Sequence, residues 1–282
     1  MDFIHVVLNL IGIGLCLSWQ SGQRRGPELY TDGSLLVSTV KRTDTIRRGQ
    51  WLNLASLGFL LMFRPLFYWH IGSELNWTPA LQVGPLALHF RSDYIGRMFI
   101  YSWLSFAGAL GMGVSWMLLL SLLNHKPGDP DPIQKFIMRQ WGFIGRLPVF
   151  LKCFLPLVAG LVFWPVLRAG LSALDIMPYP QSVGMIWKES LIMAGAFYLT
   201  WKIPAFVILF LHVINSYVYM GNQPFWHLIQ HSAKSLMKPF KWIPLQIGKV
   251  DLSPILAMPI VFFLAEALKL SLLRLFEDLV YF

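Results

Sequence analysis

The sequence predicts an all-α, polytopic membrane protein of about six transmembrane helices, and three observations support this prediction. Of the 282 residues, 56% are hydrophobic and only 13% are charged, whereas a soluble domain carries roughly 25% charged residues. The charged residues gather between apolar runs that are long enough to cross a hydrocarbon core about 30 Å thick. Lysine and arginine also concentrate in alternate loops, as the positive-inside bias of membrane proteins requires.

The first four apolar runs are each close to the length of one membrane span. The first covers about Phe3 to Trp19 and is interpreted as a retained anchor, because arginines follow it and none precedes it. The second covers about Trp51 to Trp69 and the third about Arg97 to Leu123. The fourth is bounded by Lys152 and Arg168, whose charged ends are expected to snorkel to opposite interfaces.

The last two apolar runs are harder to delimit. The segment from Trp187 to Tyr219 would measure about 50 Å as one straight helix, which exceeds the hydrocarbon thickness. Either the segment breaks at Lys202-Ile203-Pro204, leaving Ser190 to Trp201 as an outer interfacial or re-entrant piece, or it is one strongly tilted helix. The final span starts near Ile255 and is expected to end near Lys269, with an amphipathic interfacial helix over Leu270 to Phe282.

The distribution of basic residues predicts the topology. The loops after the first, third and fifth spans are the basic ones, so they should be cytoplasmic and both termini should lie outside. A topology that omits the first span, with its basic loop at an inside amino terminus, is the main alternative. The formal net charge of +9 is explained by these loops facing anionic lipid, so no nucleic-acid partner is expected.

The two later basic loops resemble one another in pattern when Pro132 is laid over Pro224. Each then shows apolar residues at the spacing i, i+3, i+4, i+8, i+11 of an amphipathic helix, with cations between them. Such helices lie in the membrane interface, where the cations contact anionic head groups, a membrane-protein partner or a second copy of the chain. The residues predicted to make these contacts are Lys135, Arg139, Arg146, Lys234, Lys238 and Lys241.

The second loop closes with a motif of spaced prolines followed by Asp-Leu-Ser-Pro. Its residues are Pro239, Pro244, Gly248, Asp251, Ser253 and Pro254. Asp251 and Ser253 suit the cap of the last span and Pro254 suits its first turn. This stretch resembles the signature of the YggT family, also called YlmG and including the cytochrome b6 assembly type. The resemblance covers two repeats, at about 97–174 and 190–272.

The resemblance implies a fold and a class of function. It implies two helix–interfacial helix–helix repeats, so the chain is predicted to divide into a two-span region at 1–96, a first repeat at 97–174, and a second repeat with its tail at 175–282. Relatives in that family are associated with envelope and osmotic stress, with cell-division loci, and in plastids with cytochrome b6 maturation and nucleoid organisation. It therefore implies a scaffold or assembly factor in the bacterial inner membrane, with a plastid membrane as the alternative.

Few residues suggest chemistry. Nucleotide-binding, protease and nucleophile motifs are absent from the sequence in their required context, so no enzyme activity and no cofactor are expected. His227 and His231 have the spacing of two metal ligands but lack a third, which favours a solvated polar face. Lys202 and Glu266 are the predicted intramembrane charges. Together with the break near Lys202 and the parallel repeat, they leave an ion or small-solute transporter or channel subunit as the alternative function.

Overall fold

The computed structural model is built almost wholly from α-helices. It describes residues 2–23, 36–124, 147–218, 223–240, 246–247, 250–251 and 253–280. Within these ranges, the backbone alone is described for residues 20–23, 36–50, 240, 246–247, 250–251 and 280. Six helical segments in these ranges are long and apolar enough to cross a membrane, which agrees with the predicted number of spans. They are Asp2–Trp19, Trp51–Glu74, Ile95–Leu123, Val149–Ala173, Val183–Tyr217 and Ser253–Leu279.

The chain forms two compact units, and each is described by itself. The first unit comprises residues 1–81 and 88–111, and the second comprises residues 82–87 and 112–282. Helix α3 (Ile95–Leu123) contributes its first part to one unit and its second part to the other. The predicted regions 1–96, 97–174 and 175–282 were defined by sequence repeats, whereas these two units are defined by compactness. The predicted regions therefore stay a prediction.

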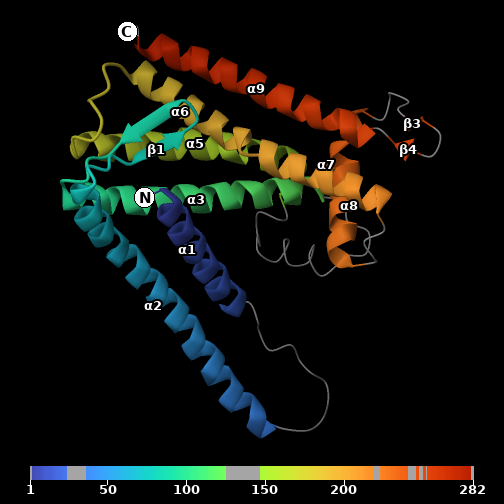
Figure 1. Ribbon diagram of the computed structural model, residues 1–282, viewed down its shortest axis with the longest axis horizontal. Helices are drawn as coiled ribbons and strands as arrows, with labels where there is room; N and C mark the ends of the chain where they lie inside the picture. Colours follow the sequence, from blue (N-terminus) through green and yellow to red (C-terminus); the bar gives the residue numbers. More distant parts are fainter. Residues whose placement is uncertain are drawn as a thin grey trace. The chain divides into compact units, whose positions relative to one another are not determined.

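In the first unit, α1 (Asp2–Gln23) packs along α2 (Leu36–Glu74), as Figure 1 shows. Helix α2 begins well before Trp51, so part of the predicted basic loop is helical in its backbone. Leu57, Leu61 and Phe106 form the apolar core between α2 and α3. Gly12 lets α1 approach this core closely, because a Cβ atom there would lie 2.7 Å from the Phe106 ring.

A short β-hairpin follows α2, where the sequence analysis placed only a loop. Strands β1 (Ala80–Val83) and β2 (Leu86–His89) pair in a two-stranded sheet. The connection is Gly84-Pro85, and Gly84 has a φ of +60°, which glycine adopts without the strain of a side chain. A partial signal was present, because apolar and polar residues alternate in Leu81-Gln82-Val83 and in Leu88-His89-Phe90-Arg91, on either side of a Gly-Pro pair.

In the second unit, α5 (Val149–Ala173) and α6 (Val183–Leu199) form an antiparallel hairpin of closely packed helices. The buried face of α5 repeats every four residues, as expected for one face of a helix. It comprises Lys152, Pro156, Gly160, Trp164, Arg168 and Ser172. At the closest point a Cβ atom on Gly160 would lie 2.6 Å from the Ala194 backbone, so only glycine permits this approach.

The long apolar segment near Lys202 is broken, as one of the two predicted arrangements had it. Helix α6 ends at Leu199, α7 (Lys202–Tyr217) begins at Lys202, and Thr200-Trp201 joins them. Helix α6 has 17 residues and starts at Val183, so it is longer than the interfacial piece expected from Ser190. Helix α9 (Ser253–Val280) runs along both α7 and α6 without a break (Figure 1), so the separate helix expected from Leu270 is wrong. The end of the span near Lys269 stays a prediction.

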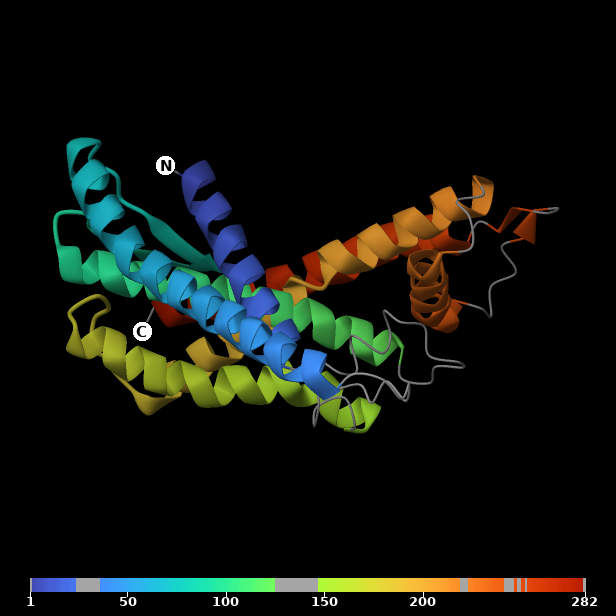
Figure 2. The same cartoon turned by 90° about the horizontal axis from the view of Figure 1, so that it is seen from below.

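Helix α8 (Pro224–Leu236) runs across the end of α7, as seen in Figure 2. Its predicted apolar stripe is largely buried in protein, because Ile229 and Ala233 pack with Ile208 and Leu209 of α7 and with Ala257 of α9. The stripe was expected to enter lipid. A 3₁₀ turn (Lys238–Phe240) and the paired strands β3 (Gln246–Ile247) and β4 (Val250–Asp251) follow α8. The equivalent first basic helix, predicted near 132–146, lies outside the described residues.

The contact between α5 and α6 leads to a testable prediction. We expect Gly160→Ala to destabilise the protein by about 1–3 kcal/mol, because the added methyl group would overlap the Ala194 backbone. Gly170→Ala on the same helix is the matched control, since a Cβ atom there meets nothing within 4 Å. Unfolding midpoints in detergent measure both. Equal midpoints for the two variants would show that the helices do not approach at Gly160.

Candidate functional site

The first unit contains a buried polar cluster centred on Arg64 of α2. The Arg64 side chain is 1% exposed. Its Nε donates to the Tyr68 hydroxyl at 3.2 Å, Nη1 donates to Asn9 Oδ1 at 3.0 Å, and Nη2 donates to the Ser105 hydroxyl at 3.3 Å. Arg64 therefore connects α2 to α1 through Asn9 and to α3 through Ser105.

His5 of α1 occupies the point where the other polar groups of this cluster meet. Its Nδ1 lies 3.0 Å from the Tyr68 hydroxyl and 3.5 Å from Arg64 Nη2. Its Nε2 lies 3.1 Å from Asn9 Nδ2 and 3.3 Å from the Tyr101 hydroxyl of α3. His5 and Asn9 are four residues apart and so share one face of α1.

Aromatic rings surround the polar cluster. The His5 and Tyr101 rings stack with centroids 5.1 Å apart, and Tyr68 meets Trp77 edge-on at 5.4 Å. Phe90, which follows β2 and is fully buried, contacts Tyr101 at 5.4 Å. These rings separate the Arg64 guanidinium from solvent, so its hydrogen bonds form in a region of low dielectric constant, where each is stronger than in water.

The cluster offers hydrogen bonds to Arg64 but little compensation for its charge. The Arg64 partners given above are all uncharged groups, and the structure shows no ion pair for Arg64 among the residues it describes. Asp2, one turn before His5, is the acidic residue of α1 and is exposed. A buried cation is costly unless its donors are satisfied, so Asn9, Tyr68 and Ser105 are required for Arg64 to remain inside.

The second unit holds a buried ion pair between α5 and α6. Arg168 Nε donates to Glu189 Oε2 at 2.9 Å, and the two side chains are 1% and 3% exposed. The same Glu189 oxygen accepts the indole N–H of Trp164 at 3.0 Å. Arg168 also donates to the Ser172 hydroxyl and to the Pro178 carbonyl. Both charges are thus paired and surrounded by hydrogen bonds, which is what makes burial of an ion pair tolerable.

Polar side chains from α3 close the break between α6 and α7. The Trp116 indole donates to the Thr200 carbonyl at 3.1 Å, and the Ser115 hydroxyl donates to the Phe197 carbonyl at 3.4 Å. The Trp201 indole donates to Ser115 at 2.7 Å. A helix break exposes backbone carbonyls that need partners. Here protein groups supply them.

The basic corner of the second unit is formed by α8 and the turn that follows. Lys234 and Lys238 are exposed, and their predicted contact with lipid or a partner stays a prediction. Helix α8 is anchored to the end of α3, because Asn124 Nδ2 donates to the Ser232 hydroxyl at 2.9 Å and Asn124 Oδ1 lies 2.9 Å from His231 Nδ1. His231 therefore serves a packing contact, and no group of three or more possible metal ligands occurs within the described ranges.

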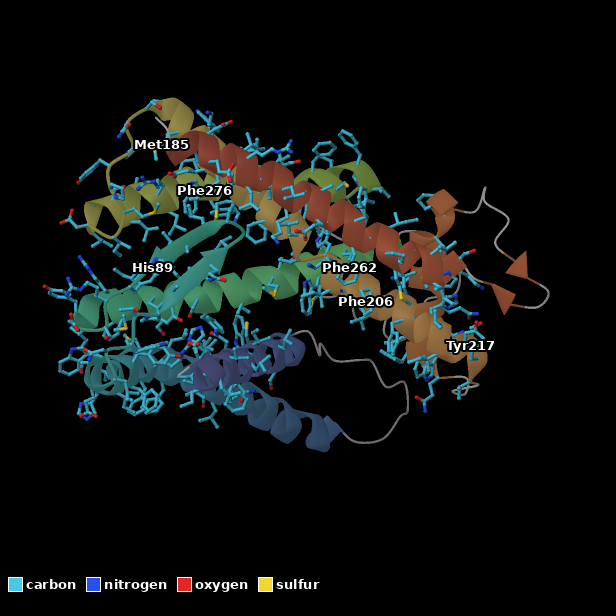
Figure 3. The ribbon with its side chains drawn as sticks, turned by 45° about the horizontal axis from the view of Figure 1, so that its top comes forward. His89, Met185, Phe206, Tyr217, Phe262 and Phe276 are labelled. Atoms are coloured by element: carbon cyan, nitrogen blue, oxygen red, sulfur yellow. The ribbon has the colours of Figure 1, made fainter. Side chains whose placement is uncertain are left out.

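The predicted intramembrane charges, Lys202 and Glu266, do not meet in a common site. The Lys202 ammonium lies 5.3 Å from the centre of the Phe262 ring. Phe262 of α9 and Phe206 of α7 are neighbours in Figure 3, with ring centroids 5.2 Å apart. Glu266 pairs with Lys269 on its own helix at 3.1 Å, and both side chains are about half exposed.

The motif residues are only partly described. Pro239 lies exposed in the 3₁₀ turn, Ser253 begins α9, and Pro254 is buried in its first turn, where proline is well suited. The backbone of Asp251 belongs to β4, and its predicted capping role stays a prediction. Outside the described residues lie Pro244, Gly248 and Lys241 of this loop and Lys135, Arg139 and Arg146 of the earlier one.

Three charged side chains inside apolar runs are buried in protein, which the sequence did not predict. Lys152 and Arg168 were expected to snorkel outward, but both are 1% exposed, and Lys152 Nζ donates to the Ser121 hydroxyl of α3 at 3.2 Å. Arg64 was not singled out, although it is the one charged residue between Trp51 and Trp69. An ionisable residue inside such a run is by default a candidate site, and that signal was available.

Comparison with protein-family models, with curated proteins and with solved structures finds no match for this chain. The likeness to the YggT family accordingly rests on the quoted sequence motif alone. What that likeness implies for this chain stays a proposal.

The buried ion pair can be tested by removing one partner or both. We expect Glu189→Ala to cost about 3–5 kcal/mol of stability, because it leaves Arg168 charged and buried without its carboxylate. The double variant Arg168→Met with Glu189→Met should recover most of this loss. Asp93→Ala, which breaks the exposed pair with Arg91, is the control and should cost about 0–1 kcal/mol. Unfolding midpoints in detergent would contradict the pairing if the double variant were no more stable than Glu189→Ala.

Proposed function

We propose that the chain is a six-span integral membrane protein that acts as a non-catalytic scaffold or assembly factor of the cell envelope. The observation that supports the membrane environment is the inverted distribution of its side chains. Phe59, Phe163 and Phe263 are 70%, 73% and 74% exposed, whereas Arg64, Lys152 and Arg168 are each 1% exposed. Such large apolar surfaces are stable in lipid and would cause aggregation in water.

The scaffold role is supported by the basic corner and by its likeness to the YggT family. The apolar segment of α6 and α7, the short amphipathic helix α8 and the last helix α9 follow one another in the order span, short helix, span that the family resemblance implies. Lys234 and Lys238 are exposed next to a helix whose apolar side is already buried, so these cations are available to an anionic partner or head group. We place the protein in a bacterial inner membrane with both termini outside.

The contacts of the second unit weigh against the transporter alternative. That alternative rested on the broken helix near Lys202 and on Glu266. Broken helices in transporters leave backbone groups free to bind the substrate, but the carbonyls at Phe197 and Thr200 already accept hydrogen bonds from Ser115 and Trp116. Glu266 is paired with Lys269 at the surface of α9.

The topology can be tested with reporter fusions in a bacterial host. Alkaline phosphatase, which is active only outside the cytoplasm, should be active when fused after Phe282 and inactive when fused after Lys238. The physical reason is that, in the proposed topology, α9 crosses the membrane once between these positions, which its length and apolar composition permit. A fluorescent protein that matures only in the cytoplasm should give the opposite pattern. An active phosphatase after Lys238 would contradict the proposed orientation.

The scaffold role can be tested by charge reversal at the basic corner. The protein is purified in mild detergent from cells, and the proteins and lipids that co-purify with it are identified by mass spectrometry. We expect Lys234→Glu with Lys238→Glu to reduce the recovery of a specific component at least about tenfold, which corresponds to about 1.4 kcal/mol. The unsubstituted protein should also retain this component less well in higher salt, since exposed charges are screened.

The matched control carries the same change of charge at the opposite side. Arg91→Glu with Arg274→Glu alters two exposed arginines, and recovery should be unchanged. In the proposed topology Arg91 lies in the outer loop and Arg274 lies toward the outer end of α9. Equal losses in both variants, or no loss in either, would contradict the role of the basic corner. Ion flux in reconstituted vesicles that is abolished by Lys202→Ala or Glu266→Ala would favour the transporter instead.

A further inference from the structure

His5 joins the amino-terminal end of α1 to the two neighbouring helices of the first unit. Its ring contacts Tyr68 and Arg64 on α2 and Tyr101 on α3, and it also contacts Asn9 one turn along α1. Further along α1, Ile13, Leu15 and Cys16 pack on an apolar core. The amino-terminal end of α1 is therefore held largely by polar contacts, whereas the rest of its packing is apolar.

The contacts around Asn9 determine which nitrogen of His5 carries the proton. Arg64 has only hydrogen-bond donors, so the atom of Asn9 that faces Arg64 Nη1 at 3.0 Å must be the oxygen Oδ1. The amide nitrogen Nδ2 is then turned toward His5 Nε2 and donates to it at 3.1 Å. We assign Nε2 as the acceptor of this bond, so the proton of the neutral ring lies on Nδ1 and is donated to the Tyr68 hydroxyl at 3.0 Å. In this tautomer Arg64 Nη2, which lies 3.5 Å from Nδ1, makes no hydrogen bond to the ring and donates to Ser105.

A second proton on His5 is incompatible with this arrangement. It would have to bind at Nε2, where its N–H would face the N–H of Asn9, so the bond from Asn9 would be lost and the Tyr101 hydroxyl at 3.3 Å would be the acceptor that remains. The resulting imidazolium would also lie 3.5 Å from the Arg64 guanidinium, with two cations in contact inside a buried cluster.

The remaining groups around the ring do not remove this conflict. Tyr68 of α2 and Tyr101 of α3 face it as neutral phenols, which can accept hydrogen bonds from the ring but carry no negative charge to offset Arg64. Asp2 of α1 attracts the charged ring, but its side chain is exposed and therefore screened by solvent, whereas Arg64 is buried.

We propose that the docking of the amino-terminal end of α1 is controlled by protonation of His5. The neutral ring joins α1 to α2 and α3, and the protonated ring separates from Arg64 and Asn9 and moves this end of α1 away. The proton comes from the aqueous phase at the amino-terminal end of α1. The proposal does not depend on the scaffold function or on the direction in which the chain crosses the membrane.

The test measures the distance between α1 and α2 as a function of pH. Spin labels are placed on cysteines introduced at Val6 and Met62, which are exposed, in the full chain with Cys16→Ala and Cys153→Ala. At about pH 8 we expect one distance, with an open population of about 10% or less. At about pH 5 a longer, broader distribution should become dominant, because histidine changes its charge across this range. An unchanged distribution at pH 5 would overturn the proposal.

Two variants separate His5 from other acid effects. Asn9→Asp places a carboxylate between Arg64 and the ring, which accepts from both and stabilises the protonated ring in place, so α1 should stay docked at pH 5. His5→Gln cannot acquire a charge and should show no response to pH. If α1 is already undocked at pH 8 in His5→Gln, the ring is needed for docking. In that case the pH response of Asn9→Asp tests the proposal. The same acid-induced opening in Asn9→Asp, or in His5→Gln, would overturn the proposal.

Discussion

A cation among apolar helices has to find its partners inside the protein, and the arrangement of both units depends on this constraint. Arg64 needs acceptors from α1, α2 and α3, and it has them in Asn9, Tyr68 and Ser105. Arg168 needs Glu189 of α6. An apolar interface tolerates sliding and rotation, because many arrangements bury similar areas. A buried cation does not, because a displaced donor loses its partner at a cost of about 1–3 kcal/mol.

The small residues of α5 and α6 complement this constraint. Gly160 allows the backbone of α6 to approach at Ala194, and Arg168 fixes which residues of α6 lie opposite by pairing with Glu189. The van der Waals contact between closely packed backbones stabilises the helix pair but does not select which residues lie opposite one another. The ion pair selects them, because its two charged groups must meet. The hydroxyl of Tyr198, which donates to the Cys153 carbonyl at 2.6 Å, fixes the other end of the same hairpin.

The sequence was sufficient for the number of apolar helices, which follows from length and hydropathy. For the segment near Lys202 it left two arrangements open, a break and one tilted helix, because its excess length fits both. It was insufficient for the direction in which charged side chains point. Lys152 and Arg168 stand at opposite ends of an apolar run, where snorkelling is the usual outcome, yet their four-residue spacing with Gly160 places them on the packed face of α5. Glu189 lies near one end of its apolar segment, and its pairing with Arg168 depends on the register of two helices, which no local pattern reveals. The cluster around Arg64 joins residues 5 to 105, so only the fold brings it together.

The two polar clusters differ in what a change of protonation would do to them. The Arg168 pair already contains both signs of charge, so Trp164, Ser172 and Glu189 stabilise one arrangement and leave no competing one. The Arg64 cluster contains a cation with neutral partners, and its geometry depends on the tautomer of His5 through a single amide, Asn9. Replacing that amide by a carboxylate would give the first cluster the composition of the second. The isosteric change Asn9→Asp therefore separates a cluster that responds to protons from one that only holds helices together, and it does so without altering the volume of the side chain.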